Sequence, residues 1–208
     1  KDVLSWPLGI LENELGLSAD RRAQMESAIF HRLTEEALQI GEAQMNVLAL
    51  DWLNGRRTPW TDPDLKGAFL GLTLGSDAPR LFKAMVEATT FGSRAIIEQF
   101  KKYDVPIDEV IALGGIPDKN PLVLQVMADV LDRPVKTVHP SQAVALGAAM
   151  FGAVVAGLFP DVKAAQKAMG GADKLVVEPI PAHVLQYEAL YQKYLDAGET
   201  LEDVLRKL

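Results

Sequence analysis

Apolar side chains recur every three or four positions in two long stretches of the N-terminal half, a spacing typical of helices. The first stretch runs from residue 18 to residue 40, and Ser18 is a typical N-cap at its start. The second stretch runs from residue 77 to residue 100, with Asp77 able to cap it and Pro79 in its first turn. Both stretches therefore predict amphipathic helices with one apolar face.

Short apolar runs bounded by turn-forming residues predict strands elsewhere. Residues 47–51 form such a run before the turn signal Asn54-Gly55, and residues 69–74 are expected to be extended. Residues 109–113 form the clearest run, and we expect a buried strand there.

The order of elements in the second half of the chain indicates an α/β fold. After the strand at 109–113, a helix is predicted for residues 120–131 with Asn120 as its N-cap. A strand at 135–138 and a helix at 141–157 follow. A strand–helix–strand–helix order at this spacing is typical of a parallel or mixed sheet with covering helices.

The stretch from residue 143 to residue 159 carries no charged side chain and raises the question of a membrane span. It is shorter than the roughly 20 residues that a span needs, and three glycines interrupt it before Pro160. We therefore expect a buried helix that packs closely on its neighbours.

The C-terminal part shows helical patterns at residues 161–169 and 183–195, and Thr200 predicts the start of a separate short helix. Its apolar and aromatic side chains could pack on their own domain or on a second subunit, as in a homodimer. We favour packing on the same domain for Tyr187, Leu190, Tyr191 and Tyr194.

Composition narrows the class of protein. The chain has 208 residues, 49% of them apolar, which is enough for one α/β domain with a core. A net charge of −7 argues against a nucleic-acid or membrane partner, because both need clustered basic residues. No cysteine is present and the three histidines are far apart, so no disulfide, thiolate nucleophile or metal site is predicted. Residues 1–10 lack the pattern of a signal peptide, which fits a cytoplasmic protein.

Gly114 and Gly115 follow the predicted strand at 109–113 and precede the helix that Asn120 begins. Glycines permit a sharp turn and let a flat ring or a phosphate approach the main chain. The free N–H groups and the positive end of the following helix favour an anion, and ligands collect at the carboxyl ends of strands in open sheets. The segment is therefore a candidate nucleotide site. Taken alone, however, a Gly-Gly pair is more often a simple tight turn, and no P-loop or dinucleotide fingerprint accompanies it.

Several motifs in a fixed order strengthen this interpretation. The run from Val110 to Val135, with its Gly-Gly, Lys-Asn, Gln and Ala-Asp positions, resembles the signature of the FGGY family of carbohydrate kinases. Residues 145–149 look like the helix that follows in that family, and residues 49–59 and 87–96 resemble two segments that precede the signature. The resemblance covers roughly residues 40–195.

The resemblance implies an actin-like (ribonuclease-H-like) α/β domain, with a mixed sheet and covering helices, incomplete on its N-terminal side. Residues 1–208 would be part of the nucleotide-binding C-terminal domain of a two-domain kinase. Within it, residues 1–45 would form a helical lead-in, residues 46–160 the α/β core and residues 161–208 a helical tail. The family's cofactors are ATP and Mg²⁺. By resemblance the nucleotide would meet Gly114 and Gly115 at its adenosine, with Lys119 and Asn120 just beyond.

Two motifs of the family are missing: the phosphate-binding loop and the aspartate motif that supplies the general base. We therefore assign no catalytic residue, expect the chain to be a piece of a longer protein, and expect it to be inactive alone. Asp2, Asp51 and Asp62 lie outside the expected motif and are interpreted as caps, turns or surface carboxylates. For Asp51 and Asn54 the resemblance favours a structural role, with contact near the cleft as the alternative.

The substrate implied by the resemblance is a pentulose, and the segments at 49–59 and 114–120 lean toward kinases of L-ribulose. Family members that act on D-ribulose, xylulose or glycerol share the scaffold. A non-catalytic ATP-binding protein of the actin-like superfamily, and an interaction domain without a ligand, remain as alternatives because a fold does not dictate a function.

Overall fold

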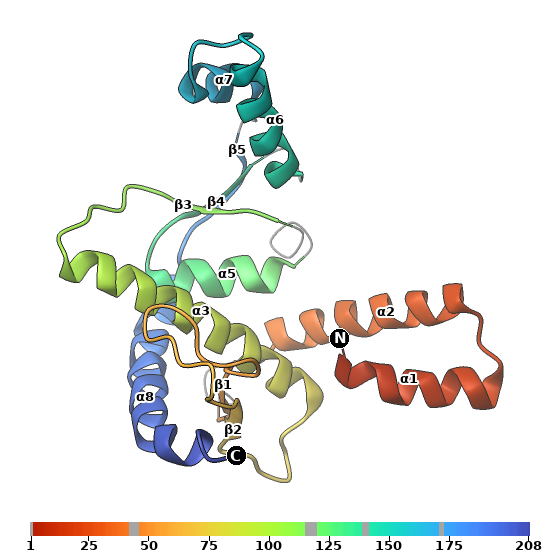
Figure 1. The fold of residues 1–208 in the computed structure, drawn as a ribbon. Coiled ribbons are helices and arrows are strands. Elements are labelled where there is room, and N and C mark those ends of the chain that lie inside the picture. Colours follow the sequence, from red (N-terminus) through yellow and green to blue (C-terminus); the bar gives the residue numbers. More distant parts are fainter. Residues whose placement is uncertain (1, 42–45, 115–119, 139–141, 171–172) are drawn as a thin grey trace.

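The structure is a computed structural model that describes residues 2–41, 46–114, 120–138, 142–170 and 173–208 (Figure 1). Helix α1 (Asp2–Leu15) and helix α2 (Ala19–Leu38) form a hairpin that projects from the side of the molecule. The Ser18 side chain accepts a hydrogen bond from the Arg21 N–H, which confirms the predicted cap. Helix α1 falls within the helical lead-in expected for residues 1–45, but its bounds were not predicted, because Pro7 and Gly9 obscure its pattern.

The centre of the molecule is built on α3 (Ala78–Lys102), which Asp77 caps as predicted. A short antiparallel pair, β1 (Leu48–Leu50) and β2 (Ala68–Leu70), packs against it through β1. The strand expected at 47–51 is confirmed at reduced length, whereas the extended segment expected at 69–74 is a strand only at residues 69 and 70.

The second sheet has three strands in the order β3-β4-β5. Strand β3 (Val110–Ala112) is parallel to β4 (Val135–Val138), with α5 (Pro121–Leu131) between them in the chain, as predicted. The burial predicted for strand β3 is only partly correct, since Ala112 is buried but Ile111 is 47% exposed. Strand β5 (Asp173–Val177) joins β4 in antiparallel orientation and makes the sheet mixed. This strand was missed because residues 161–208 were interpreted as a helical tail. The boundary between the α/β core and this tail, placed at residue 160, stays a prediction.

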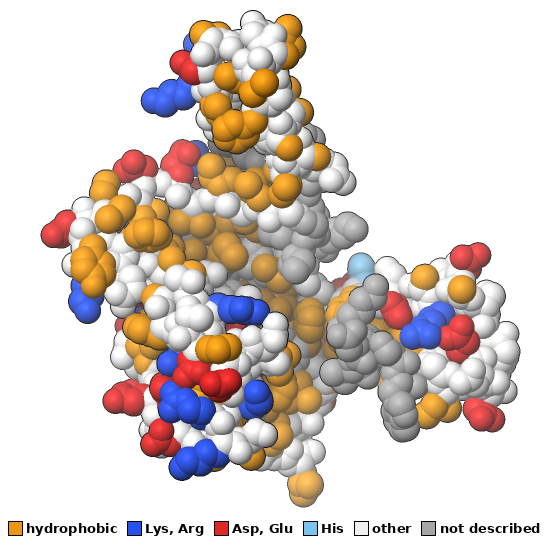
Figure 2. Space-filling view, in the orientation of Figure 1, with side chains coloured by type: hydrophobic (Ala, Val, Ile, Leu, Met, Phe, Trp, Pro, Cys, Tyr) orange, Lys and Arg blue, Asp and Glu red, His pale blue; other side chains and the backbone are white. Residues whose placement is uncertain are grey.

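Helix α6 (Ala143–Val155) and α7 (Val162–Met169) form a hairpin beyond this sheet, and apolar side chains are visible over that end of the molecule (Figures 1 and 2). The helix predicted at 141–157 is present, but its predicted burial is wrong, since Met150 is its one buried side chain. Helix α6 packs mainly on α7, and its contacts with the other described elements are weak at most. Phe151 and Val155 are 61% and 89% exposed.

The last helix, α8 (Pro181–Leu205), is continuous through Thr200, so the separate short helix predicted there is wrong. Gly198 lies inside α8, where a Cβ atom would come within 3.1 Å of the Trp52 ring. This glycine therefore allows close packing and does not end the helix.

Aromatic residues of α8 pack around Phe91 of α3. The Phe91 ring centroid lies 6.3 Å from that of Tyr187, 5.7 Å from that of Tyr191 and 5.2 Å from that of Tyr194. Phe91 is fully buried and the three tyrosines are nearly so. The prediction that these side chains pack on their own domain is confirmed.

Charged groups are buried beside this aromatic cluster. The Tyr187 hydroxyl donates to a Glu87 carboxylate oxygen at 3.1 Å, and Lys83 Nζ donates to the Ile40 carbonyl at 2.8 Å. Burial raises the pKa of Glu87 to about 7, although the Lys83 charge and the Tyr187 hydrogen bond oppose this shift.

This pKa leads to a prediction for stability. Between the unfolded value of 4.5 and about 7 the folded protein binds more protons at Glu87 than the unfolded chain, so stability falls as pH rises through that window. A shift of this size corresponds to roughly 3.4 kcal/mol at about 1.4 kcal/mol per unit, and roughly 2–3 kcal/mol of it falls between pH 5 and pH 8. We would measure the free energy of unfolding in urea at pH 5, 6, 7 and 8. Between pH 5 and pH 8 we expect this free energy to fall by roughly 2–3 kcal/mol less in Glu87→Gln than in the parent chain. The same slope in both proteins would contradict the prediction.

Candidate functional site

The candidate nucleotide site begins where β3 ends. Gly114 has φ +106°, a conformation that strains any residue with a side chain, and a Cβ there would meet nothing within 4 Å. The main chain is therefore open to a ligand at this point. Gly115 and Lys119, the other positions predicted here, lie outside the described residues.

Asn120 starts α5, as predicted. Its Oδ1 accepts from the N–H groups of Leu122 and Val123 at 3.1 and 3.4 Å, and its Nδ2 donates to Thr34 Oγ1 at 3.2 Å. Since Pro121 has no N–H, the first turn is satisfied within the protein. The expectation of free N–H donors is corrected accordingly: what α5 offers an anion is the positive end of its dipole, with no acidic residue in its first turn.

Asp129, which is part of the family signature but was given no role from the sequence, fixes α5 in place. Its side chain is 1% exposed, and Oδ1 accepts from Gln125 Nε2 at 2.9 Å and from the Ile180 N–H at 2.7 Å. Its Oδ2 lies 2.9 Å from His183 Nδ1 on α8. The residue joins α5 to α8, and no local pattern in the sequence could have revealed these partners.

The two described aspartates that were considered for catalysis have different surroundings. Asp51 is half-buried, and burial raises its pKa, opposed by hydrogen bonds that include one with the Thr89 side chain. Asp62 is paired with Arg206 at 2.7 Å, and this hydrogen bond lowers the pKa of its carboxyl group. Within the described ranges, no group of three or more His, Asp and Glu side chains is placed to hold a metal ion.

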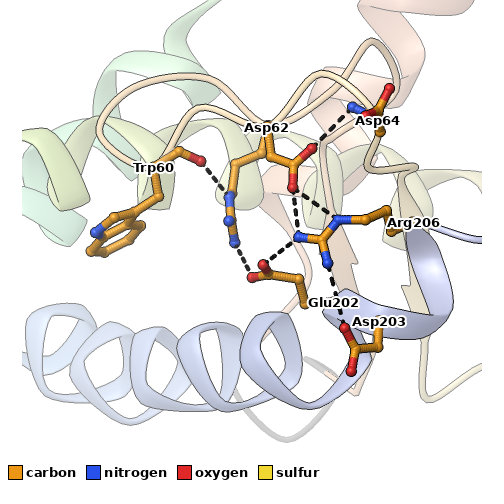
Figure 3. A network of polar contacts seen from close by, with 7 residues as sticks. Trp60, Asp62, Asp64, Glu202, Asp203 and Arg206 are labelled. Atoms are coloured by element: carbon orange, nitrogen blue, oxygen red, sulfur yellow. Dashed lines mark hydrogen bonds and ion pairs between the residues drawn. The ribbon is translucent and has the colours of Figure 1, made fainter.

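A cavity of about 390 Å³ lies elsewhere, between the loop after β1, α3 and α8. Gly114 and Asn120 are not among the residues that line it. Ion pairs hold the loop to the end of α8, where Arg206 contacts Asp62 and Glu202, each at 2.7 Å (Figure 3). The candidate nucleotide site and this cavity are therefore separate features of the chain.

Comparison with known proteins assigns the fold to a class. The sequence profile of the FGGY family of carbohydrate kinases, C-terminal domain, matches residues 3–156. The chain belongs to this family, as its motifs predicted. Among the described residues, none of the helices is long and apolar enough to cross a membrane.

Curated relatives narrow the comparison to one kind of kinase. The chain is 39% identical to a ribulokinase of Vibrio parahaemolyticus over 204 residues, which cover 98% of this chain and 36% of that protein. It is 43% identical to a ribulokinase of Bacillus licheniformis over 173 residues, covering 80% of this chain and 31% of that protein. The chain thus spans about a third of the length of these relatives.

Solved structures show the same fold at lower identity. A ligand-bound xylulose kinase of Lactobacillus acidophilus matches with a TM-score of 0.73 and 23% identity, over 84% of this chain and 35% of that one. A glycerol kinase of Plasmodium falciparum with ADP matches with a TM-score of 0.63 and 14% identity, over 93% of this chain and 36% of that one. The predicted α/β kinase fold is confirmed.

Proposed function

We propose that this chain is the C-terminal, nucleotide-binding part of an ATP-dependent ribulokinase that phosphorylates L-ribulose in arabinose catabolism in the cytoplasm. One observation carries the proposal: relatives named ribulokinase are 35–43% identical to the chain over 80–100% of its length. The motifs at residues 49–59 and 114–120 support the same choice of sugar.

The proposed share of this chain in the reaction is to hold the nucleotide. ATP, bound with Mg²⁺, would supply the phosphoryl group that a sugar hydroxyl accepts. Gly114 and Gly115 would line the adenosine, because a turn without side chains lets a flat ring reach the main chain. Lys119 would place a positive charge beyond them, and Asn120 would hold the first turn of α5 in position. Closure against a second domain would exclude water from the transfer.

The general base and the phosphate-binding loop would come from a part of the enzyme that precedes this chain. We therefore expect the 208-residue chain alone to give no sugar-dependent ADP release above background. The measurement is a coupled ADP assay with Mg-ATP and L-ribulose, with the chain alone and with the full-length protein compared at equal concentration. Release by the chain alone at a rate normal for a kinase, ~1–100 per second, would overturn this assignment.

The full-length protein also tests the substrate. L-ribulose, D-ribulose, D-xylulose and glycerol would be compared by kcat/KM, and we expect L-ribulose to be preferred. Preference for another sugar would keep the kinase and correct the substrate. ATP binding without release of ADP for any sugar would favour a non-catalytic actin-like protein. A homodimer stays a prediction, which sedimentation of the same sample would test.

A further inference from the structure

The cavity between the loop at residues 51–60, α3 and α8 has features of a preformed small-molecule site. Its volume of about 390 Å³ lies within the range usual for ligand pockets, about 300–1,000 Å³. Three aromatic side chains line it: Trp52 and Tyr194 are almost fully buried, and Trp60 is 45% exposed. A half-exposed indole at the mouth of a pocket offers a flat apolar surface to a ligand.

Hydrogen bonds fix the loop that forms one wall. Arg56 donates from Nη1 to Glu202 at 2.8 Å and from Nε to the Trp60 carbonyl at 2.6 Å, and its guanidinium lies 5.1 Å from the Trp52 ring centroid. Figure 3 shows Asp62 and Glu202 converging on Arg206 beside this wall, while the Trp60 indole points away from the ion pairs. Gly55 has φ +76°, and a Cβ there would lie 2.6 Å from the main chain of Pro63. The wall is held in place without a ligand.

Polar groups around the cavity are left available. Arg57 and Glu199 line it from exposed positions and have no side-chain partner within the part of the chain that the structure describes. Asp51 adds a half-buried carboxylate that pairs with no described cation. Counted with the Arg56–Glu202 pair, the lining carries three carboxylates and two guanidinium groups. This excess of negative charge disfavours a phosphate-bearing ligand.

We propose that this cavity binds a neutral, polyhydroxylated small molecule, a sugar or sugar alcohol, at a site separate from the nucleotide site. A hydroxyl group both donates and accepts, so hydroxyls can donate to Asp51 and Glu199 and accept from Arg57. An anionic group lacks the donors for the two carboxylates, and an ammonium group lacks the acceptor for Arg57. The C–H faces of such a molecule can lie on the Trp60 ring. The site lies wholly within this chain, whereas the proposed kinase function places its general base outside it.

Gly92 provides a direct test. It lines the cavity from α3, and a Cβ built there meets nothing within 4 Å, so a side chain can start there without a clash and Gly92→Leu is expected to occupy part of the cavity. Gly152 of α6 is the matched control, since it is also a helical glycine with nothing within 4 Å and lies away from the cavity. Both changes replace a glycine within a helix by leucine, so both raise the helix propensity at their position by a similar amount. A difference in binding between the two variants therefore reflects the cavity.

The experiment follows tryptophan emission of the chain during titration with L-ribulose, ribitol and D-xylulose, and with L-ribulose 5-phosphate as the anionic probe. We expect a saturable blue shift with at least one neutral probe, at least tenfold weaker binding in Gly92→Leu, and binding within twofold of the parent in Gly152→Leu. The phosphate ester should bind at least tenfold more weakly than the neutral sugar.

Three outcomes would overturn the proposal: no saturable shift with any neutral probe, equal binding by Gly92→Leu, or binding of the phosphate ester as tight as that of the sugar. None of these outcomes bears on ADP release by the full-length protein. A failure of the proposed kinase function and a failure of this site are therefore distinguished by separate measurements.

Discussion

Replacing Phe91 by alanine is expected to destabilise the protein by about 3–5 kcal/mol, the usual cost of removing a buried aromatic ring. Phe91 is 0% exposed and contacts the rings of Tyr187, Tyr191 and Tyr194, with centroid distances of 5.2–6.3 Å. Its loss removes apolar burial and leaves a cavity between α3 and α8. Three large rings on one helix cannot collapse into that space without moving the helix, so little of the loss can be recovered.

Urea denaturation followed by circular dichroism measures this effect. Phe151→Ala is the matched control, since Phe151 is 61% exposed on α6 and its loss should cost less than about 1 kcal/mol. A cost below about 1.5 kcal/mol for Phe91→Ala, or equal costs for both variants, would show that the contact between α3 and α8 does not stabilise the core as the structure indicates.

Replacing Asp129 by alanine is expected to cost about 3–5 kcal/mol, because it removes a buried carboxylate that accepts several hydrogen bonds, each worth about 1.5–3 kcal/mol when the acceptor is charged. The change removes the acceptor for Gln125 Nε2 and for the Ile180 N–H, and leaves His183 without its partner at 2.9 Å. Because a buried donor without an acceptor keeps its full desolvation cost, the loss exceeds the value of the hydrogen bonds themselves.

Asp196→Ala is the control for this change. Asp196 is exposed on α8 and has no side-chain partner among the described residues, so its removal should alter stability by less than about 0.5 kcal/mol. Asp129→Asn keeps one acceptor oxygen and should fall between the two. If Asp129→Ala were no more destabilising than Asp196→Ala, the network between α5 and α8 would have no stabilising role.

These contacts matter for the proposed nucleotide site, because they position its supporting helix. Asn120 caps the first turn of α5. Near the other end of the helix, Asp129 anchors α5 to the start of α8, and the next residue, Val130, is part of the hydrophobic core. The position of Gly114 relative to α5 depends on this anchoring. Residues far from the glycine turn therefore determine whether the turn and the helix can meet one ligand together.

Local signals along the chain determined much of the structure. Ser18, Asp77 and Asn120 each cap the helix predicted from their position, because a cap bonds to an N–H two or three residues away. The strands at 110–112 and 135–138 followed from short apolar runs between turn residues. The order of motifs from residue 49 to residue 149 indicated the kinase family, which the comparisons confirmed.

Contacts between distant residues were decided by tertiary structure alone. The charge-free stretch after residue 143 predicted burial, yet a pattern of apolar residues cannot say whether a neighbour covers them, and Met150 is the one buried side chain of α6. Thr200 looked like a helix start because threonine is a common N-cap, whereas α8 runs through it and nearby Gly198 makes room for Trp52. Asp129 and His183 are 54 positions apart, and Arg56 and Glu202 are 146 apart. Spacing along a chain constrains only what one helix turn or one strand can reach, so the anchoring of α5 and the walls of the cavity arise only once the chain is folded.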